Sequence, residues 1–233
     1  MGYIDAQDLV KQYGTGETTV TALGGVSLQI ARGEFVAIMG ESGSGKSTLL
    51  SMLGGLNSPT SGTFLVDGIE VYILTSDQRA DFRKNSIGFV FQNFHLLPYL
   101  TLAENVMLPL AIVNRNKRAK RSAAMEALGQ VGLATKGNRL PNQISGGEQE
   151  RVAIARAIVN RPPIILADEP TGNLDTRTGA EIMKLFAALN CEGLTVIMVT
   201  HSPEYAHYAR RLIRLSDGHL AGEGMAPPPG GQA

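Results

Sequence analysis

The fold of this chain is decided by the stretch Gly40-Glu41-Ser42-Gly43-Ser44-Gly45-Lys46-Ser47-Thr48. An apolar, partly β-branched run at 35–39 precedes it and is typical of a buried strand, while residues 46–53 after it favour a helix. Glycines let the backbone approach an anion closely, and the amides of a helix N-terminus attract negative charge. The strand, loop and helix together predict a phosphate-binding loop, with Lys46 directed at the β- and γ-phosphates of a nucleotide and Ser47 at Mg²⁺. A Gly/Ser-rich linker is the competing interpretation, and the flanking elements disfavour it.

Composition limits the classes of protein that the chain can represent. It has 233 residues, 43% of them hydrophobic, which suffices for one large or two small domains. Lysine plus arginine and aspartate plus glutamate both total 21, so bulk electrostatics gives no indication of nucleic-acid binding. The single cysteine, Cys191, excludes an intramolecular disulfide and favours a reducing compartment. No signal-peptide pattern is visible, and no apolar run approaches the roughly 18 residues of a membrane span, so we expect a cytosolic chain.

Periodicity along the chain predicts a mixed α/β domain over 1–222. An early antiparallel portion at 3–10 and 20–30 precedes the loop strand. Further strands are expected at 63–66, 87–91, 164–167 and 195–199, and helices at 75–84, 101–107, 117–131, 146–160 and 176–190. Asp217-Gly218 predicts a hairpin turn, Ser202-Pro203 a helix start, and 223–233 a flexible tail.

Two surface features stand out between these elements. The segment 91–110 is unusually apolar for a loop, which is typical of an interface, although packing within a group of helices explains its side chains equally simply. A basic cluster, Lys117, Arg118, Lys120 and Arg121, begins the helix at 117, and we interpret it as a solvated helix face.

Asp168 and Glu169 follow the apolar strand at 164–167. A carboxylate at this position can hold Mg²⁺ near the phosphate loop, and its neighbour can orient or deprotonate an attacking water. A solvated turn is the plain alternative.

Ser145-Gly146-Gly147-Glu148-Gln149 has the pattern of a capping box, which alone marks only a helix start. It lies about 20 residues before the carboxylate pair, and its serine, glycines and helix N-terminus predict a second anion site.

These motifs, in this order, resemble those of ATP-binding cassette (ABC) ATPases over nearly the whole chain. The resemblance makes 40–48 the Walker A loop, 145–149 the signature loop, Asp168 and Glu169 Walker B, and Asp175 the D-loop aspartate. It implies that Lys46, Gln92, Glu169 and His201 are catalytic and that Ser47, Gln92 and Asp168 hold Mg²⁺. ATP is implied to contact Tyr13, Gly40, Glu41, Ser42, Gly43, Ser44, Gly45, Lys46, Ser47, Thr48, Ser145, Gly146, Gly147, Glu148, Gln149 and Asp175.

The resemblance also implies an architecture and partners. We expect a P-loop NTPase fold of the ABC type, with a mixed core sheet, an antiparallel β subdomain, and a helical subdomain inserted at about 93–160. ATP binding is expected to form a homodimer in which Ser145 of one copy meets the ATP held by Lys46 of the other. A separate membrane permease would dock near residues 91–110 and place the chain on the inner face of the cell membrane, with no nucleic acid involved.

Residues 93–98 and 167–175 resemble most the ATPases of lipoprotein-releasing and macrolide-efflux systems (LolD/MacB type). FtsE-like ATPases, which regulate envelope or division machinery, are the alternative. Glu150 replaces a glutamine common in the family, and we expect its charge to weaken anion binding at the signature helix.

Other classes fit less well. Repair and translation members of the family carry a long coiled coil or two cassettes, whereas this chain has one cassette. Kinases and GTPases lack the signature loop, and the guanine motif Asn-Lys-x-Asp is absent here. A module that senses ATP without hydrolysing it is disfavoured by Glu169.

Overall fold

The antiparallel part of the fold comes from the N-terminal part of the chain. The computed structural model describes residues 2–114 and 116–226. One sheet has the strand order β2-β1-β4-β5 and comprises β1 (Ile4–Tyr13), β2 (Val20–Ile30), β4 (Ser61–Val66) and β5 (Ile69–Glu70). Along β2, Val26 and Leu28 are buried while Ser27 and Gln29 are exposed, so one face of the sheet covers the core.

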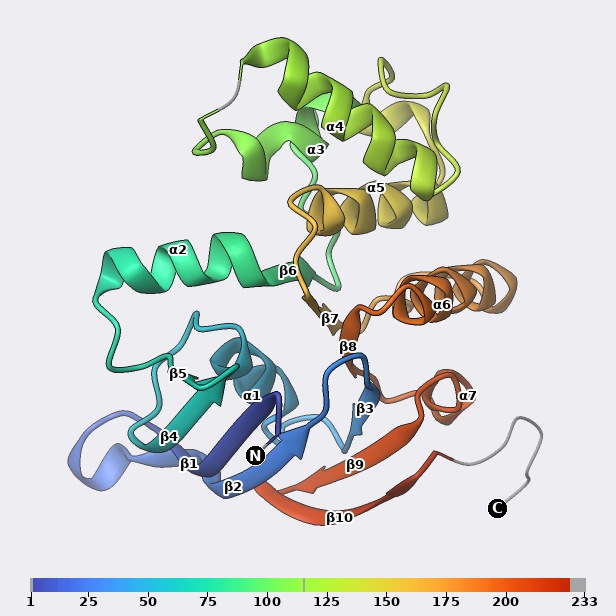
Figure 1. Ribbon diagram of the computed structural model, residues 1–233. Helices are drawn as coiled ribbons and strands as arrows, with labels where there is room; N and C mark the ends of the chain where they lie inside the picture. The colour runs from blue at the N-terminus through green and yellow to red at the C-terminus, as the bar shows by residue number, and fades with distance from the viewer. Residues whose placement is uncertain (1, 115, 227–233) are drawn as a thin grey trace.

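A second sheet, with strand order β10-β9-β3-β8-β7-β6, lies beside the first (Figure 1). Its strands are β3 (Phe35–Met39), β6 (Ile87–Val90), β7 (Ile164–Asp168), β8 (Thr195–Val199), β9 (Arg211–Ser216) and β10 (His219–Met225). Pairing is parallel from β9 through β6, and only β10 runs antiparallel. The carboxyl ends of β3, β7 and β8 therefore meet at one edge, where ligand sites of such sheets form.

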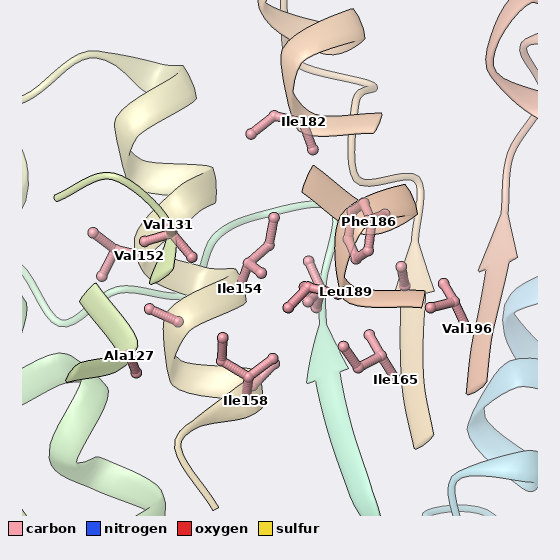
Figure 2. Close-up of a cluster of buried hydrophobic side chains, with 14 of the residues drawn as sticks. Ala127, Val131, Val152, Ile154, Ile158, Ile165, Ile182, Phe186, Leu189 and Val196 are labelled. Carbon is pink, nitrogen blue, oxygen red and sulfur yellow. The ribbon is translucent and has the colours of Figure 1, made fainter. Parts of the chain in front are cut away.

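Alternate residues of the parallel strands feed two separate hydrophobic clusters. Val36 and Ile197 point toward α1 (Lys46–Leu53) and the antiparallel sheet. Ile165 and Val196 point the other way, toward Phe186 of α6 (Thr176–Cys191), as Figure 2 shows. Burial on both faces explains why these strands are continuously apolar in sequence.

The helices between β6 and β7 form a group set apart from the sheets (Figure 1). They are α3 (Leu102–Met107), the 3₁₀ turn η2 (Leu108–Leu110), α4 (Lys117–Gln130), η3 (Pro141–Gln143) and α5 (Gly146–Ile158). Figure 2 shows Ala127 of α4 and Ile154 and Ile158 of α5 in the cluster that reaches Phe186. The predicted helical insertion is confirmed, and it is joined to the core by apolar packing.

Local start signals are confirmed at three helices. Thr75, Thr101 and Ser145 each accept a hydrogen bond from the third following amide, and the side chain at that third position bonds back to the cap amide. These caps begin α2 (Ser76–Ser86), α3 and α5. Pro203 begins α7 (Pro203–Ala206), but the Ser202 side chain makes no capping hydrogen bond.

Several predicted boundaries are corrected. The first strand continues to Tyr13, and the strand from Ile87 ends at Val90. The tail expected from residue 223 begins too early, because 223–225 pair with β9 as part of β10. Its remainder from 227 lies outside the described residues. Within the described part of the chain, no helix has the length and apolar character of a membrane span.

Candidate functional site

The predicted phosphate loop links β3 to α1. Gly43 and Gly45 have φ values of 83° and 96°, which glycine adopts without strain. A side chain at Gly45 would place its Cβ 2.5 Å from the carbonyl oxygen of Ala22, so only glycine fits there. Lys46 is buried, and its Nζ donates to the carbonyl oxygens of Gly40 at 2.8 Å and Glu41 at 2.7 Å. The ammonium group is thus held inside the loop, where phosphates are expected.

The turn between β9 and β10 supports this loop from behind. Gly218 donates its amide hydrogen to the carbonyl of Ser44 at 3.1 Å, and it accepts from the amide of Gly24 in β2 at 2.9 Å. Gly40 lies so close to the carbonyl of Leu215 in β9 that a Cβ would approach to 2.1 Å. The sequence predicted the hairpin at Asp217-Gly218 but gave no sign of its contact with the loop, because the contact joins segments more than 170 residues apart.

Ser47 and Asp168 lie side by side at the ends of α1 and β7. The Ser47 hydroxyl donates to Asp168 Oδ1 at 3.1 Å. Burial raises the pKa of Asp168 above its usual range, while the Ser47 hydrogen bond opposes that shift. These two hard oxygen donors fit Mg²⁺, which takes one or two protein ligands and completes its shell with phosphate oxygens and water. The described residues contain no cluster of three or more side chains that could enclose a metal on their own.

Glu169 is joined to His201 across the ends of β7 and β8. Glu169 Oε2 lies 2.9 Å from Nδ1 of His201 and accepts the backbone amide of the same residue at 3.3 Å. Glu169 also has a φ of 48°, an uncommon value for a non-glycine residue, and its amide donates to the carbonyl of Val199 at 3.0 Å. The backbone therefore holds this carboxylate at the edge of the sheet, with only 13% of its side chain exposed.

Gln92 follows β6 and reaches the same space. Its carbonyl accepts from Asn173 at 2.9 Å, which ties the segment after β6 to the loop after β7. A cavity of about 400 Å³ opens here, and its lining comes from five segments. It is lined by Ala22, Ser42, Gly43, Gly45, Lys46, Ser47, Thr48, Gln92, Glu169 and His201. The structure thus brings together most of the residues predicted for phosphate binding and catalysis.

The signature loop lies elsewhere in the same chain. None of residues 145–149 lines that cavity. Ser145 caps α5, and Glu148 forms an ion pair with Lys136, which together with the Ser145 amide lowers the pKa of Glu148. A side chain at Gly147 would collide with Thr178, whose amide and hydroxyl are both held by Asp175. The segment predicted to bind a second anion therefore lies apart from the cavity that contains Lys46.

Tyr13 lies at the end of β1 and is 45% exposed. Its hydroxyl accepts a hydrogen bond from Asn57 at 2.6 Å, and the Lys11 ammonium lies 5.1 Å from the centre of its ring. The ring does not line the cavity around Lys46.

Glu150 corrects an expectation. Its side chain is fully buried in α5, and neither carboxylate oxygen has a hydrogen-bond partner among the described residues. Burial raises the pKa of Glu150 to about 8, against a smaller lowering by Arg156. The group is mostly neutral at pH 7, so it does not oppose anion binding through a negative charge as the sequence suggested.

Two polar side chains that sequence reasoning missed, the buried Asn105 and the half-buried Arg156, fix the segment after Gln92. The Asn105 side chain accepts from the amide of Leu97 at 2.7 Å and donates to the carbonyls of Leu97, Leu100 and Thr101. Arg156 donates to the carbonyls of Phe94 and His95, both at 2.6 Å. Their only sequence signal was polarity at positions that the helical pattern places inside.

A loop of this kind between a parallel strand and a helix, with carboxylates at the end of another strand of the same sheet, defines a P-loop nucleotide-binding protein. Comparison with known proteins then gives the family: residues 23–172 match the one described as ABC transporter. The chain belongs to that family and represents its ATPase component, which uses ATP with Mg²⁺.

Individual relatives of the chain support the same family assignment. The macrolide export ATP-binding/permease protein MacB of Syntrophobacter fumaroxidans is 48% identical over 97% of this chain, which covers 32% of that protein. The chain therefore spans about a third of such relatives. An uncharacterised ABC transporter ATP-binding protein of Methanocaldococcus jannaschii, MJ1508, is 48% identical, with 93% of this chain and 97% of that one covered.

A solved structure has the same fold. The ATP-binding cassette MJ0796, described as a dimer in a post-hydrolysis state bound to ADP and Pi, is 45% identical with a TM-score of 0.88. The match covers 96% of this chain and 99% of that one. The predicted ABC ATPase fold, the activity class and the resemblance to macrolide-efflux ATPases are confirmed.

Proposed function

We propose that this chain hydrolyses ATP to drive a separate membrane permease of the lipoprotein-releasing or macrolide-efflux type. The observation that carries the proposal is that Lys46, Ser47, Glu169 and His201 line one cavity, with Asp168 hydrogen-bonded to Ser47. An FtsE-like role in envelope or division control uses the same site, and only the partner distinguishes the two.

Phosphoryl transfer to water depends on positioning and on stabilising charge. Lys46 exchanges its two loop carbonyls for phosphate oxygens when ATP enters, which costs little because the ammonium is already buried and in place. Mg²⁺ supplies charge neutralisation on the phosphates, and Ser47, Asp168 and Gln92 are the residues that would hold it. Loop amides of residues 42–47 bind the remaining oxygens.

Glu169 is the proposed base that orients and deprotonates the attacking water. The bond from Glu169 Oε2 to His201 fixes the carboxylate and brings an imidazole to the γ-phosphate side of the cavity. Tyr13, exposed at the end of β1, is the proposed stacking partner of the adenine. Stacking on an aromatic ring discriminates little between bases, so we expect GTP also to be hydrolysed to some degree.

Dimerisation completes this site. A single chain keeps Ser145 away from the cavity that contains Lys46, so the signature loop acts on ATP held by a second copy. Two copies related by a two-fold axis would enclose two ATP molecules. The dimeric state described for the ATP-binding cassette MJ0796 supports this arrangement.

The permease is proposed to bind beside the segment 91–110. An apolar hollow of about 390 Å³ lies between α2, β6 and α5 and is lined in part by Leu56, Phe89 and Phe91. Tyr99 is 73% exposed, and Phe94, Leu97 and Leu100 are only half-buried. Such exposure favours an interface over internal packing. A short cytoplasmic helix of the permease fits this hollow and would place the chain on the inner face of the membrane.

Phosphate release by the purified chain, followed by mass spectrometry of the membrane protein that co-purifies with it, tests the proposal. ATP-dependent phosphate release and a permease of the release or efflux class support it. A chain that binds ATP without releasing phosphate contradicts the activity, and co-purification with division proteins alone favours the FtsE-like role.

A further inference from the structure

The basic cluster at the start of α4 is out of place for a solvated helix face. Lys117, Arg118, Lys120 and Arg121 occupy four of its first five positions, and all but Lys120 are exposed. A helix N-terminus carries about half a positive charge, so cations there are unfavourable. Four of the other helices, α2, α3, α5 and α7, have an acidic residue in the first turn, whereas α1 and α6 do not. The first turn of α4 has none.

Within the described part of the chain, the hydrogen-bond partners of the cluster are neutral: Lys120 donates to the carbonyl of Ala111, and Arg121 donates to the side-chain oxygen of Asn138 at 2.6 Å. None of its four side chains forms an ion pair there. Glu104 is the nearby carboxylate, and its pKa is lowered first by hydrogen bonds from Thr101 and only then by Lys117 and Arg121. Because the whole chain has zero formal charge, this local excess is not part of a general basic character.

The cluster adjoins an apolar surface. Lys120 donates to the carbonyl of Ala111 at 3.1 Å, and the next residue, Ile112, is 72% exposed and lines the hollow beside β6. Arg83, Lys84 and Arg156 line the same hollow, whereas no carboxylate does. Basic side chains next to an exposed aliphatic one are typical of surfaces that rest on the headgroup layer of a bilayer.

We propose that the start of α4 and Ile112 contact the anionic surface of the membrane. The four cations meet lipid phosphates while Ile112 enters the apolar edge of the headgroup layer. The proposal rests on the proposed function only in that a permease brings the chain to the membrane. The phosphates of a nucleic acid could also pair with these cations. A nucleic acid provides no apolar layer for the exposed Ile112 side chain, so the lipid surface is favoured.

Flotation of the full chain with vesicles tests this contact. The neutral vesicles consist of phosphatidylcholine alone, and the anionic vesicles contain phosphatidylcholine with phosphatidylglycerol. Both are tested at low and high salt. The test variant is Lys117→Gln/Arg118→Gln. The matched control is Lys184→Gln/Arg214→Gln, which removes the same charge from exposed positions on α6 and β9. Melting temperature and phosphate release are measured on every variant.

We expect the unmodified chain and the control to bind only anionic vesicles, less so at high salt. The cluster variant should bind about 25-fold more weakly, from about fivefold per cation at an anionic surface. Ile112→Ser should weaken binding without changing its salt dependence. Equal binding by the cluster variant and its control, or no binding to anionic vesicles, overturns the proposal. Binding of duplex DNA in place of vesicles assigns the cluster to nucleic acid. Unchanged phosphate release in the cluster variant keeps this test separate from the proposed function.

Discussion

The amide of Gly218 donates to the carbonyl of Ser44 at 3.1 Å, so the turn between β9 and β10 holds the back of the phosphate loop. A second Asp-Gly turn, at Asp67-Gly68, has nearly the same backbone, with φ values of 51° and 78° against 48° and 75°. A Cβ at Gly68 would meet nothing within 4 Å, whereas one at Gly218 would lie 2.8 Å from the carbonyl oxygen of Ala22. The two turns therefore share the same strain but differ in what they touch.

Gly218→Ala should weaken ATP binding, while Gly68→Ala should not. Both variants force an alanine to positive φ, which costs each about 1 kcal/mol of stability. Only Gly218→Ala displaces the loop, and we expect roughly tenfold weaker nucleotide binding from a lost loop hydrogen bond. Titration with a fluorescent ATP analogue, alongside melting temperatures, measures both effects. Equal nucleotide affinity in the two variants would show that the turn does not position the loop.

Lys46→Ala and Glu169→Gln should fail at different steps. Removing the Lys46 ammonium should weaken ATP binding about 10- to 100-fold, the contribution of a hydrogen bond to a charged group. Glu169→Gln keeps the size of the side chain, so ATP should bind normally while turnover falls about 10²- to 10⁴-fold. Equilibrium binding and single-turnover phosphate release separate the two. If both variants lose binding equally, Glu169 is not the base.

The sequence predicted the phosphate loop, the carboxylate pair and the capped helices because each is a local pattern. Thr75, Thr101 and Ser145 show this well, since a cap involves only the next three residues. The Gly218 contact could not be predicted, because it joins backbone segments that are far apart in the sequence. The partners of Asn105 lie within eight residues of it, but they belong to an irregular stretch of backbone that no local pattern indicates. The effect of Glu150 was mistaken because its burial, which decides its charge, is not visible in the sequence.

Glu150→Gln should stabilise the chain at alkaline pH. In the unfolded chain the carboxyl ionises near pH 4.3, whereas burial raises its pKa to about 8 in the fold. Between these values unfolding releases a proton, so the carboxyl makes the fold less stable as pH rises. Glutamine does not ionise, so Glu150→Gln does not lose this stability as pH rises. The melting temperature of Glu150→Gln, relative to that of the unmodified chain, should rise from about pH 5 to pH 8. A pH-independent difference would contradict the buried neutral carboxyl.

Tyr99→Asp should abolish binding to the permease and leave basal ATP hydrolysis intact. Tyr99 is 73% exposed, so a charge there costs the fold little but spoils an apolar contact. Met225→Asp is the control, since Met225 is 83% exposed on β10, at the opposite edge of the sheet from β6. Co-purification of the permease measures the effect. Leu97→Asp, at a half-buried position, should act in the same way. An unfolded Leu97→Asp together with normal permease binding by Tyr99→Asp would assign the segment to internal packing instead.

We propose that each ATP is bound between Lys46 of one copy and Ser145 of another. Because one chain keeps these residues apart, the dimer should require nucleotide and persist when hydrolysis is blocked. The most direct measurement is the mass of Glu169→Gln by gel filtration with light scattering, with and without saturating ATP. We predict a dimer with ATP, a monomer without it, and a monomer that still binds ATP when Ser145→Arg is added. A Glu169→Gln protein that stays monomeric at saturating ATP, or a Ser145→Arg variant that loses ATP binding, would contradict the account.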